Sequence, residues 1–370
     1  MKIAILGASK PHLTLYLKAK EMGLETYCIA WNKGAYCRDY ADHYFDISIL
    51  EKERIADFCM REGISAIISN AIEEAVPTMA YVSERCGFIG NSYKVAQLAT
   101  NKLEMRKCIA KISLCYQPRF NVVHSLDFQS EYFPIIVKPT DGSCSKGVSK
   151  VNSQSELASA IRHALHYSSK KEVLVEQFIE GKEVSVETIS YKGKHYILTI
   201  TDKETTGSPY FVELAHHQPS QLKIDIQKKI RENATRVLNS LGIQNGASHI
   251  EFKVDINQNV YFIELGARGG GDFISYNLVE LSTGYDYVKG MIQVAIGQFE
   301  EPSVREVCYS GIYFLCQETE GLLKFVHNND TPYWMIEKHI DNNKLVSAEK
   351  SQDRSGYFIY KDTHKISLRK

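Results

Sequence analysis

The chain has 370 residues, which is more than one compact core usually contains, so two or three domains are expected. Its 44 basic and 44 acidic residues balance, whereas a protein whose main partner is nucleic acid normally carries a basic excess. No segment approaches the roughly 18–20 apolar residues of a membrane span, so no membrane partner is expected. The nine cysteines are scattered without a C-x-x-C pair, which favours reduced thiols and a cytoplasmic location.

Residues 1–95 alternate between strand and helix patterns. Strands are expected at Ile3–Leu6, Glu25–Ala30 and Ala66–Ser69, and helices at Pro11–Met22 and Ile55–Arg61. This alternation predicts a parallel, doubly wound sheet, which binds ligands at the carboxyl ends of its strands. Gly7-Ala8-Ser9 and Asn70 should lie at that edge. The full G-x-G-x-x-G pattern is absent, so a nicotinamide cofactor is not expected.

After residue 95 the regular alternation ends, which predicts a mixed α+β region. The elements expected there are a helix over Lys102–Ile112, strand-rich sequence from Phe133 to Ile200 with a helix near Glu156–Leu165, a helix at Lys223–Leu241, strands at His249–Asp255 and Val260–Leu265, and a helix over about Tyr285–Ile296. Residues 305–370 are less regular, with short strands around Ile312–Leu315 and Gly356–Tyr360, and the sequence assigns them no role.

Two glutamates, Glu251 and Glu264, each interrupt an apolar strand. If Asn257-Gln258 form a two-residue hairpin turn, Glu251 lies directly opposite Glu264 on one face of the sheet. The core face would then hold Ile250, Phe252, Ile263 and Leu265. Like charges opposite each other destabilise a sheet unless a cation lies between them, and carboxylate oxygens favour Mg²⁺ or Mn²⁺. The pair is therefore a candidate metal site, or else two carboxylates on a solvated face.

The segment Gly266–Asp272, here called the glycine-rich loop, follows directly after the second of these strands. Three consecutive glycines allow the backbone to approach a ligand closely, and Arg268 offers a planar guanidinium for a phosphate or a carboxylate. A flexible loop with an exposed arginine is the alternative interpretation. The position beside the candidate metal ligands favours a function.

Two further segments could bind a nucleotide. In the first, a buried strand delivers Lys138 to a loop rich in glycine and serine between Gly142 and Gly147, whose backbone N–H groups could bind phosphates. It is not a P-loop, because Val148 stands where the lysine of that motif is needed, before Ser149. In the second, Glu176–Glu183 connects two strands and could offer backbone atoms to adenine and carboxylates to ribose. An ordinary turn and a solvated hairpin are the respective alternatives.

These motifs, in this order, resemble those of the ATP-grasp superfamily over about residues 1–300. The branch they resemble most contains amino-acid ligases and the synthetase half of carbamoyl-phosphate synthase. In that family a first lysine precedes the lid domain, and Asn101-Lys102 looks like it. A second lysine ends a lid strand before a flexible glycine-rich segment, as Lys138 does here.

The hinge and the metal pair of the family also have counterparts. The hinge pattern E-x-[FY]-[IVL]-x-G-x-E looks like Glu176–Glu183, and the magnesium-binding pair looks like Glu251 and Glu264. Gly266 departs from the pattern, because many members place a metal-binding asparagine there. The segment Tyr210–Ser220 is similar to a loop near the reacting groups, although its histidine pair could also be plain surface.

The resemblance implies an α/β protein with an ATP-grasp fold and an α+β lid. Its parts would be an N-terminal doubly wound parallel-sheet domain at 1–95, a linker helix at 96–112, a small lid at 113–190 and a larger C-terminal α+β domain at 191–370. The implied cofactors are ATP and Mg²⁺ or Mn²⁺. The implied nucleotide-binding residues are Lys102, Lys138, Ser143, Ser145, Gly147, Glu176, Phe178, Ile179 and Glu183. The implied metal ligands are Glu251 and Glu264, the catalytic residues are Lys138 and Arg268, and the residues near the substrates are His216, His217, Gly269 and Gly270.

The resemblance also implies a reaction. Family members phosphorylate a carboxylate with ATP and let an amine attack the acyl phosphate, so the expected partners are a small carboxylic acid and an amine, and a homodimer is possible. A carboxylase or a carbamoyl-phosphate-type reaction with bicarbonate is the enzymatic alternative. The non-enzymatic alternative is a module that senses ATP without turnover.

Overall fold

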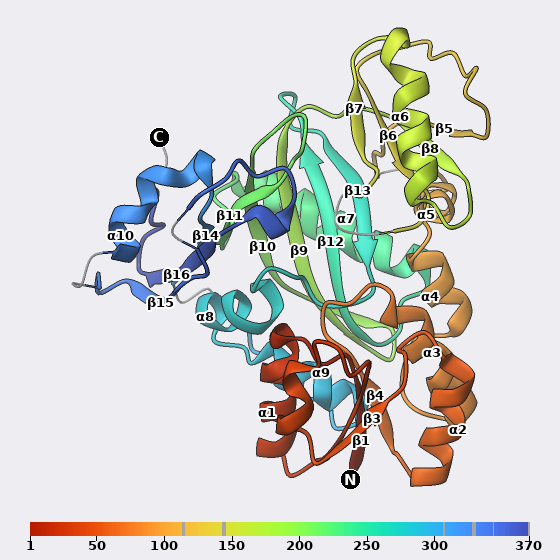
Figure 1. Cartoon of the computed structure of the whole chain (residues 1–370), viewed down its shortest axis with the longest axis vertical. Coiled ribbons are helices and arrows are strands. Elements are labelled where there is room, and N and C mark those ends of the chain that lie inside the picture. Colours follow the sequence, from red (N-terminus) through yellow and green to blue (C-terminus); the bar gives the residue numbers. More distant parts are fainter. Residues whose placement is uncertain (113–114, 143–145, 306–307, 328–330, 343, 369–370) are drawn as a thin grey trace.

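The computed structural model describes residues 1–112, 115–142, 146–305, 308–327, 331–342 and 344–368. Within these ranges the strands form three sheets. Figure 1 shows them as an N-terminal part in red and orange, a small yellow-green part at the top right, and a large central sheet that continues into the blue C-terminal part. No helix within these ranges is both long enough and apolar enough to span a membrane.

The N-terminal sheet is parallel, as the sequence predicts, with the strand order β3-β2-β1-β4. Its strands are β1 (Lys2–Leu6), β2 (Glu25–Ala30), β3 (His43–Asp46) and β4 (Ala66–Ile68), and the helices around it are α1 (Leu13–Glu21), α2 (Lys52–Glu62) and α3 (Ala75–Cys86). Residues 3–6 of β1 are fully buried, because helices or the rest of the molecule cover both faces of the sheet. The sequence does not predict β3, which is short and largely exposed.

A small antiparallel sheet with the order β5-β8-β6-β7 comes next. Two helices, α4 (Tyr93–Ala99) and α5 (Lys102–Ile109), lead to it. Its strands are β5 (Phe120–Val123), β6 (Ile135–Pro139), β7 (Ser149–Val151) and β8 (Val173–Gln177), and α6 (Gln154–Tyr167) covers one face. Leu157, Ile161 and Ala164 of α6 pack with Val137 and Val175 in a core that belongs to this sheet alone.

The large sheet has the order β13-β12-β9-β10-β11-β14-β16-β15 and is antiparallel throughout. Its strands are β9 (Lys182–Tyr191), β10 (Lys194–Thr205), β11 (Glu213–Gln218), β12 (Gly246–Val254), β13 (Val260–Gly266), β14 (Tyr309–Phe314), β15 (Met335–Ile340) and β16 (Gly356–Asp362). Its helices are α7 (Ile224–Leu241), α8 (Val279–Thr283), α9 (Tyr287–Ala295) and α10 (Leu323–His327). Short 3₁₀ turns lie at Lys10–His12, Tyr36–Tyr40, Gln317–Leu322 and Ser351–Asp353, and a π-helical turn lies at Ile274–Leu278.

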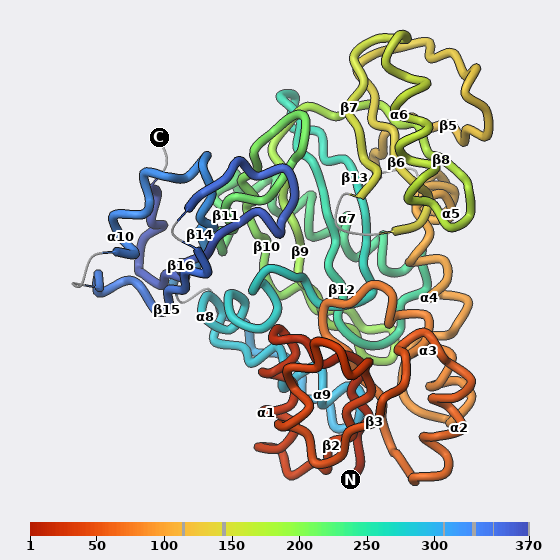
Figure 2. The backbone as a smooth tube through the Cα atoms, viewed as in Figure 1, coloured from red at the N-terminus to blue at the C-terminus, as the bar shows by residue number. Residues whose placement is uncertain are grey.

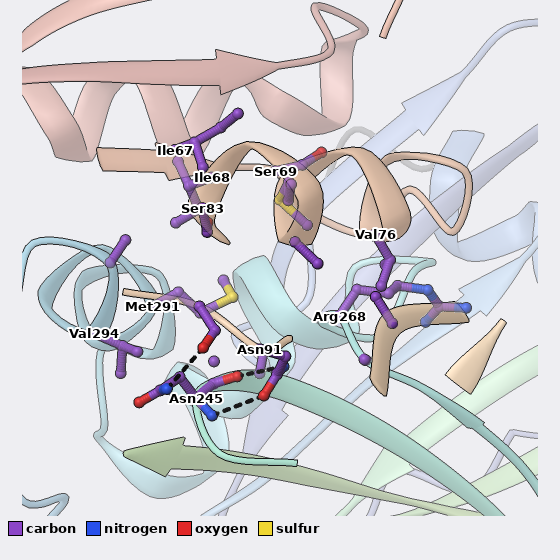
Figure 3. A pocket seen from close by; sticks show the side chains of 18 of the residues that line it. Ile67, Ile68, Ser69, Val76, Ser83, Asn91, Asn245, Arg268, Met291 and Val294 are labelled. Atoms are coloured by element: carbon purple, nitrogen blue, oxygen red, sulfur yellow. Dashed lines mark hydrogen bonds between the residues drawn. The ribbon is translucent and has the colours of Figure 1, made fainter. Parts of the chain in front are cut away.

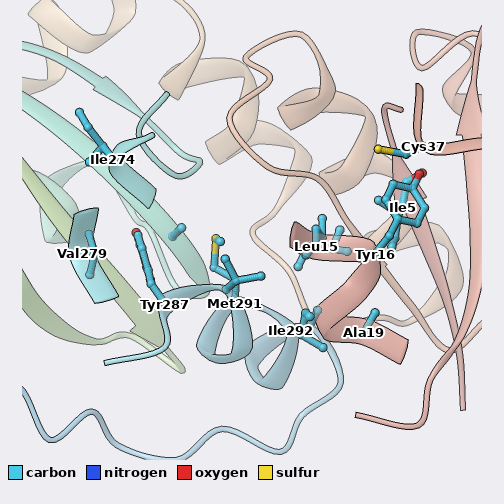
Figure 4. Close-up of a cluster of buried hydrophobic side chains, with 14 of the residues drawn as sticks. Ile5, Leu15, Tyr16, Ala19, Cys37, Ile274, Val279, Tyr287, Met291 and Ile292 are labelled. Atoms are coloured by element: carbon cyan, nitrogen blue, oxygen red, sulfur yellow. The ribbon is translucent and has the colours of Figure 1, made fainter. Parts of the chain in front are cut away.

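Two cores fix the large sheet against the rest of the chain. The amphipathic face of α7 packs its residues Ile230 and Val237 onto Ile250 and Phe252. In the other core α9 lies between the large sheet and the N-terminal part. Figure 4 shows Met291 and Ile292 of α9 beside side chains of α1, so the N-terminal part shares a core with the large sheet.

The sheets and the expected domains differ at the end of the lid, and two helices, α4 and α5, stand where one linker helix at 96–112 was expected. The expected range 113–190 includes β9, but β9 pairs with β10 and β12 of the large sheet. The small sheet ends at Gln177, and we therefore propose the end of the lid there. Residues 305–370, to which the sequence assigned no role, are here called the C-terminal part. Their described residues contribute three strands that extend the large sheet on the side away from the small sheet (Figure 2).

Candidate active site

The hairpin of β12 and β13 brings Glu251 directly opposite Glu264, as predicted. The predicted turn is wrong, because the whole segment Asp255–Asn259 forms the connection, with the backbone N–H of Asp255 donating to the carbonyl of Asn259 at 3.1 Å. A bulge after Glu251 compensates for the longer connection and restores the register. For the same reason Phe262 is fully buried in the core, and Ile263, which was expected there, is only half-buried.

Each of the two carboxylates is paired with a lysine whose side chain is largely shielded from solvent. Lys203 Nζ lies 2.6 Å from Glu251 Oε1, and Lys102 Nζ lies 2.9 Å from Glu264 Oε1. Burial opposes the ionisation of Glu251, but Lys203 and His249 outweigh it and hold the pKa of Glu251 well below its usual range. The two strands therefore present two oxygen-donor side chains on one face, in an environment that already accommodates positive charge.

The pair fits a magnesium ion that also binds a nucleotide. Among the residues that the structure describes, no group of three or more His, Cys, Asp or Glu side chains could hold a metal ion. Mg²⁺ in nucleotide sites usually binds one or two carboxylates together with phosphate oxygens and water, and Glu251 and Glu264 meet that requirement. Gly266 adds no third ligand. A Cβ at this position would lie 3.0 Å from both Arg268 Cζ and Glu73 Oε2, so these two side chains fill the space beside it.

Lys138, at the end of β6, belongs to a buried ion-pair network. Its Nζ lies 2.7 Å from Glu176 Oε2, and Arg106 Nε donates to Glu176 Oε1 at 2.6 Å. Burial lowers the pKa of Lys138, and the two cations outweigh burial to hold the pKa of Glu176 at about 2. The carboxylate of Glu176 thus pairs with Lys138 and Arg106, and the ribose contact that the resemblance implied stays a prediction. Arg106 was missed, although it lies four residues after Lys102 on one face of α5.

The loop after Lys138 lies against Lys102, whose Nζ donates to the Gly142 carbonyl at 2.8 Å. Ser143 and Ser145, two predicted nucleotide-binding residues, lie outside the described residues. Gly147 has φ +75°, and a Cβ there would lie 3.0 Å from Tyr167 Cβ, so packing against the end of α6 accounts for this glycine.

The predicted hinge Glu176–Glu183 joins the small sheet to the large one. The centre of the Phe178 ring lies 4.1 Å from Lys150 Nζ and 5.1 Å from Lys253 Nζ, while Ile179 is buried. Glu183 Oε1 lies 3.3 Å from Lys203 Nζ. The hinge therefore borders the same charged region as the two facing glutamates.

Arg268 of the glycine-rich loop reaches the N-terminal part of the chain. Its Nε donates to Glu73 Oε2 at 3.1 Å, and its Nη1 donates to the Gly269 carbonyl at 3.0 Å. Burial raises the pKa of Glu73 despite the neighbouring arginine. Sequence reasoning missed Glu73, which lies three residues after Asn70, the residue expected at the ligand-binding edge.

Protein contacts explain two of the three consecutive glycines of this loop, Gly269 and Gly270. A Cβ at Gly269 would lie 2.8 Å from Ser275 Cβ, and a Cβ at Gly270 would lie 2.8 Å from His249 Nδ1. The Gly270 N–H also donates to Glu187 Oε2 at 3.1 Å, and His249 hydrogen-bonds the other oxygen of that buried carboxylate. Only at Gly271, within the loop, would a Cβ meet no atom within 4 Å.

The two candidate histidines of β11 point to opposite faces of the sheet. His216 Nε2 lies 3.9 Å from Asp272 Oδ2 at the end of the glycine-rich loop, and its buried Nδ1 has no hydrogen-bond partner. Burial lowers the pKa of His216 to about 4, so the ring is neutral at pH 7. His217 hydrogen-bonds Tyr360 and Glu204 on the other face. Strand periodicity alone would have separated the pair.

Two cavities lie beside the N-terminal part. One, of ≈ 90 Å³, is lined by apolar side chains of α3 and α9 and is bordered by the Asn91–Asn245 hydrogen bonds (Figure 3). Arg268 lies at its edge with the guanidinium directed away from Asn245. The other, of ≈ 350 Å³, lies at the carboxyl ends of the parallel strands and is lined in part by Gly7, Ala8 and Ser9, at the edge where ligands were expected.

Comparisons with known proteins identify the fold. Residues 131–276 match the family model described as the ATP-grasp domain. The fold agrees over nearly the whole chain with an L-amino acid ligase from Bacillus licheniformis, with a TM-score of 0.83, 23% identity, and coverage of 98% of this chain and 93% of that chain. This chain carries an ATP-grasp domain.

Other solved structures and curated sequences are also similar. The N5-carboxyaminoimidazole synthetase from Staphylococcus aureus complexed with ADP has a TM-score of 0.78 and 18% identity, and covers 98% of this chain and 93% of that chain. Among curated proteins, alanine–anticapsin ligase of Bacillus subtilis (strain 168) is 28% identical over 245 residues, which are 59% of this chain and 51% of the relative. D-alanine–D-alanine ligase of Chlorobium luteolum (strain DSM 273 / BCRC 81028 / 2530) is 29% identical over 199 residues, 50% of this chain and 54% of the relative. The chain thus spans about half the length of these curated relatives.

Proposed function

We propose that this ATP-grasp protein is an ATP-dependent ligase that activates a carboxylate as an acyl phosphate and joins it to an amine, with release of ADP and phosphate. The observation that carries the proposal is the facing pair Glu251 and Glu264, each neutralised by a lysine and followed in the chain by Arg268. The relatives named as alanine–anticapsin and D-alanine–D-alanine ligases support an amino acid or a similar small molecule as substrate.

Charge neutralisation and positioning would be the main tasks of the nucleotide site, because phosphoryl transfer needs little covalent chemistry from the protein. Lys102 and Lys138 would bind phosphate oxygens, and Glu251 with Glu264 would hold Mg²⁺ or Mn²⁺. When bound, ATP supplies the phosphoryl group, and the metal neutralises the charge that develops on it. Glu176 would act through Lys138 by fixing the direction of its ammonium group, since the two groups are already 2.7 Å apart.

Arg268 would bind the carboxylate of the first substrate and then the transferred phosphoryl group. Its guanidinium is held by Glu73 and the Gly269 carbonyl, so it is fixed in direction before a substrate arrives. An acyl phosphate hydrolyses in water, so the reaction needs a cover over the site. The small sheet suits that task, because its loop already contacts Lys102 through Gly142.

The amine would then attack the acyl carbon, forming the C–N bond while the C–O bond to phosphate breaks. Of the two candidate histidines, His216 is the one on the side of the glycine-rich loop, and the Nδ1 atom of its neutral ring, which has no hydrogen-bond partner, can accept a hydrogen bond from an amine. His217 faces the C-terminal part and has no place in this proposal.

The test is ATP turnover by the purified full chain with Mg²⁺ and a panel of L- and D-amino acids, alone and in pairs, with bicarbonate as a separate arm. We expect phosphate release that depends on an amino-acid pair, and mass spectrometry should find an amide of the two. Turnover only with bicarbonate would replace the proposal by a carboxylase or carbamoyl-phosphate-type reaction. ATP binding without turnover in every arm would support the sensing module instead. A cytoplasmic location and a homodimer stay predictions.

A further inference from the structure

One residue of the C-terminal part reaches the glycine-rich loop. Arg354 precedes β16, and its Nη1 and Nη2 donate to Asp272 Oδ2 and Oδ1 at 2.7 and 2.8 Å. This is a two-pronged ion pair between a planar guanidinium and a carboxylate, and the Arg354 side chain is only 11% exposed. It links the loop that carries Arg268 to a region whose role the sequence does not predict.

The guanidinium of Arg354 is itself fixed on its other sides. Its Cζ lies 3.8 Å from the centre of the Phe314 ring on β14, and its Nε donates to the Ser351 carbonyl at 2.9 Å. A lysine could keep the charge but not the planar stacking or the two parallel hydrogen bonds. The contact therefore depends on arginine specifically.

The loop needs such a contact because its end is strained. Asp272 and Phe273 have φ values of +49° and +68°, in the left-handed region that non-glycine residues rarely adopt. Both are held by the C-terminal part, since Asp272 pairs with Arg354 and the Phe273 ring lies 4.3 Å from that of Tyr357 on β16. Two consecutive strained residues with partners from one region indicate that this region imposes the loop's conformation.

The same loop carries the groups of the proposed reaction. Arg268 lies four residues before Asp272, and the Gly270 N–H is bound to Glu187 between them. We propose that Arg354 is a positioning residue, which acts through Asp272 to hold the glycine-rich loop so that Arg268 stays aimed at the reacting groups. The inference deepens the proposed ligase function and rests on it. The C-terminal part is then a support of the active site.

The kinetic test compares Arg354→Lys, Asp272→Asn and the double variant with the wild type. We expect each single variant to lower kcat about tenfold or more with the KM for ATP within about twofold, because small misplacements of a catalytic group are costly while nucleotide binding lies elsewhere. The double variant should be no worse than either single variant, because both break one contact. Asparagine tolerates the positive φ at 272. Arg305→Lys, an exposed arginine before β14, is the matched control and should resemble the wild type.

A second measurement does not depend on activity. Hydrogen exchange of the Gly270 amide should become at least about tenfold faster in Arg354→Lys and remain unchanged in Arg305→Lys, because the opening of the loop becomes more favourable. If the wild type shows no ligase turnover, the proposed function fails, and exchange alone decides whether Arg354 holds the loop. Unchanged exchange and kcat in Arg354→Lys would overturn the inference. A loss of activity in Asp272→Asn together with normal activity in Arg354→Lys would also overturn it, because Asp272 would then act on a substrate directly.

Discussion

Glu251 on β12 lies directly opposite Glu264 on β13. Each carboxylate forms an ion pair with a lysine from another element, Glu251 with Lys203 of β10 and Glu264 with Lys102 of α5. Two like charges can face each other here because each has its own counter-ion. When Mg²⁺ binds with ATP, the two lysines would pair with phosphate oxygens, and the two carboxylates would bind the metal. This exchange of partners leads to the first prediction.

Glu264→Gln keeps the shape of the side chain and removes its charge. We expect turnover to fall at least about a hundredfold, because removal of a ligand weakens the metal that neutralises the transferred group. The free energy of unfolding without nucleotide should change by only about 1 kcal/mol or less, because the lost pair with Lys102 is partly exposed and the repulsion from Glu251 is also removed. Steady-state kinetics and urea unfolding measure the two effects. Glu232→Gln, an exposed carboxylate of α7, is the control.

Lys138→Ala should raise the KM for ATP and slow turnover. It should also destabilise the fold by up to about 3 kcal/mol, because Glu176 is left buried with Arg106 as its remaining partner. Lys111→Ala, at an exposed site after α5, controls for loss of a lysine. Unchanged kinetics in Lys138→Ala would mean that this lysine only neutralises Glu176.

Arg268→Lys retains the charge but loses the planar guanidinium. We expect kcat to fall about tenfold or more while the KM for ATP stays within about twofold, because the arginine acts on the carboxylate and on the transferred group. Glu73→Gln should have a smaller effect in the same direction, since it loosens the arginine without removing it. Normal kcat in Arg268→Lys would reduce the arginine to a structural partner of Glu73.

Gly270→Ala and Gly271→Ala form a matched pair. A methyl group at 270 would lie 2.8 Å from His249 and 2.9 Å from Glu187, whereas at 271 it would meet no atom within 4 Å. We expect Gly270→Ala to lower the free energy of unfolding by about 1–3 kcal/mol and Gly271→Ala to leave it nearly unchanged. If both variants changed the free energy of unfolding equally, the glycines would be needed for backbone conformation or for a ligand more than for packing. Thermal or urea unfolding of both variants decides the matter.

Sequence reasoning worked where a local period determines the geometry. The alternation of two strands placed Glu251 opposite Glu264, and a buried strand correctly delivered Lys138 to the charged region. The same alternation could have shown that His216 and His217 point to opposite faces. The turn itself was wrong, and the pairing survived because a bulge compensated for it.

The rest of the site depends on contacts between distant segments, which no local pattern encodes. Arg106 reaches a carboxylate 70 residues away, and Arg268 reaches one 195 residues away. Arg354 is also isolated in the sequence, and the fold alone brings it to Asp272. Glycines 269 and 270 looked like a ligand-binding motif, but the side chains that require them come from other elements.

The most direct test of the central claim follows the oxygen of the substrate carboxylate. Once the turnover panel has identified an acid, that acid is supplied with ¹⁸O in its carboxylate, together with ATP, Mg²⁺ and the amine, and the products are analysed by mass spectrometry. An acyl phosphate route transfers one ¹⁸O to inorganic phosphate, because the carboxylate oxygen leaves with the phosphoryl group. The nucleotide product of this route is ADP. Label in AMP, with release of pyrophosphate, would contradict the account.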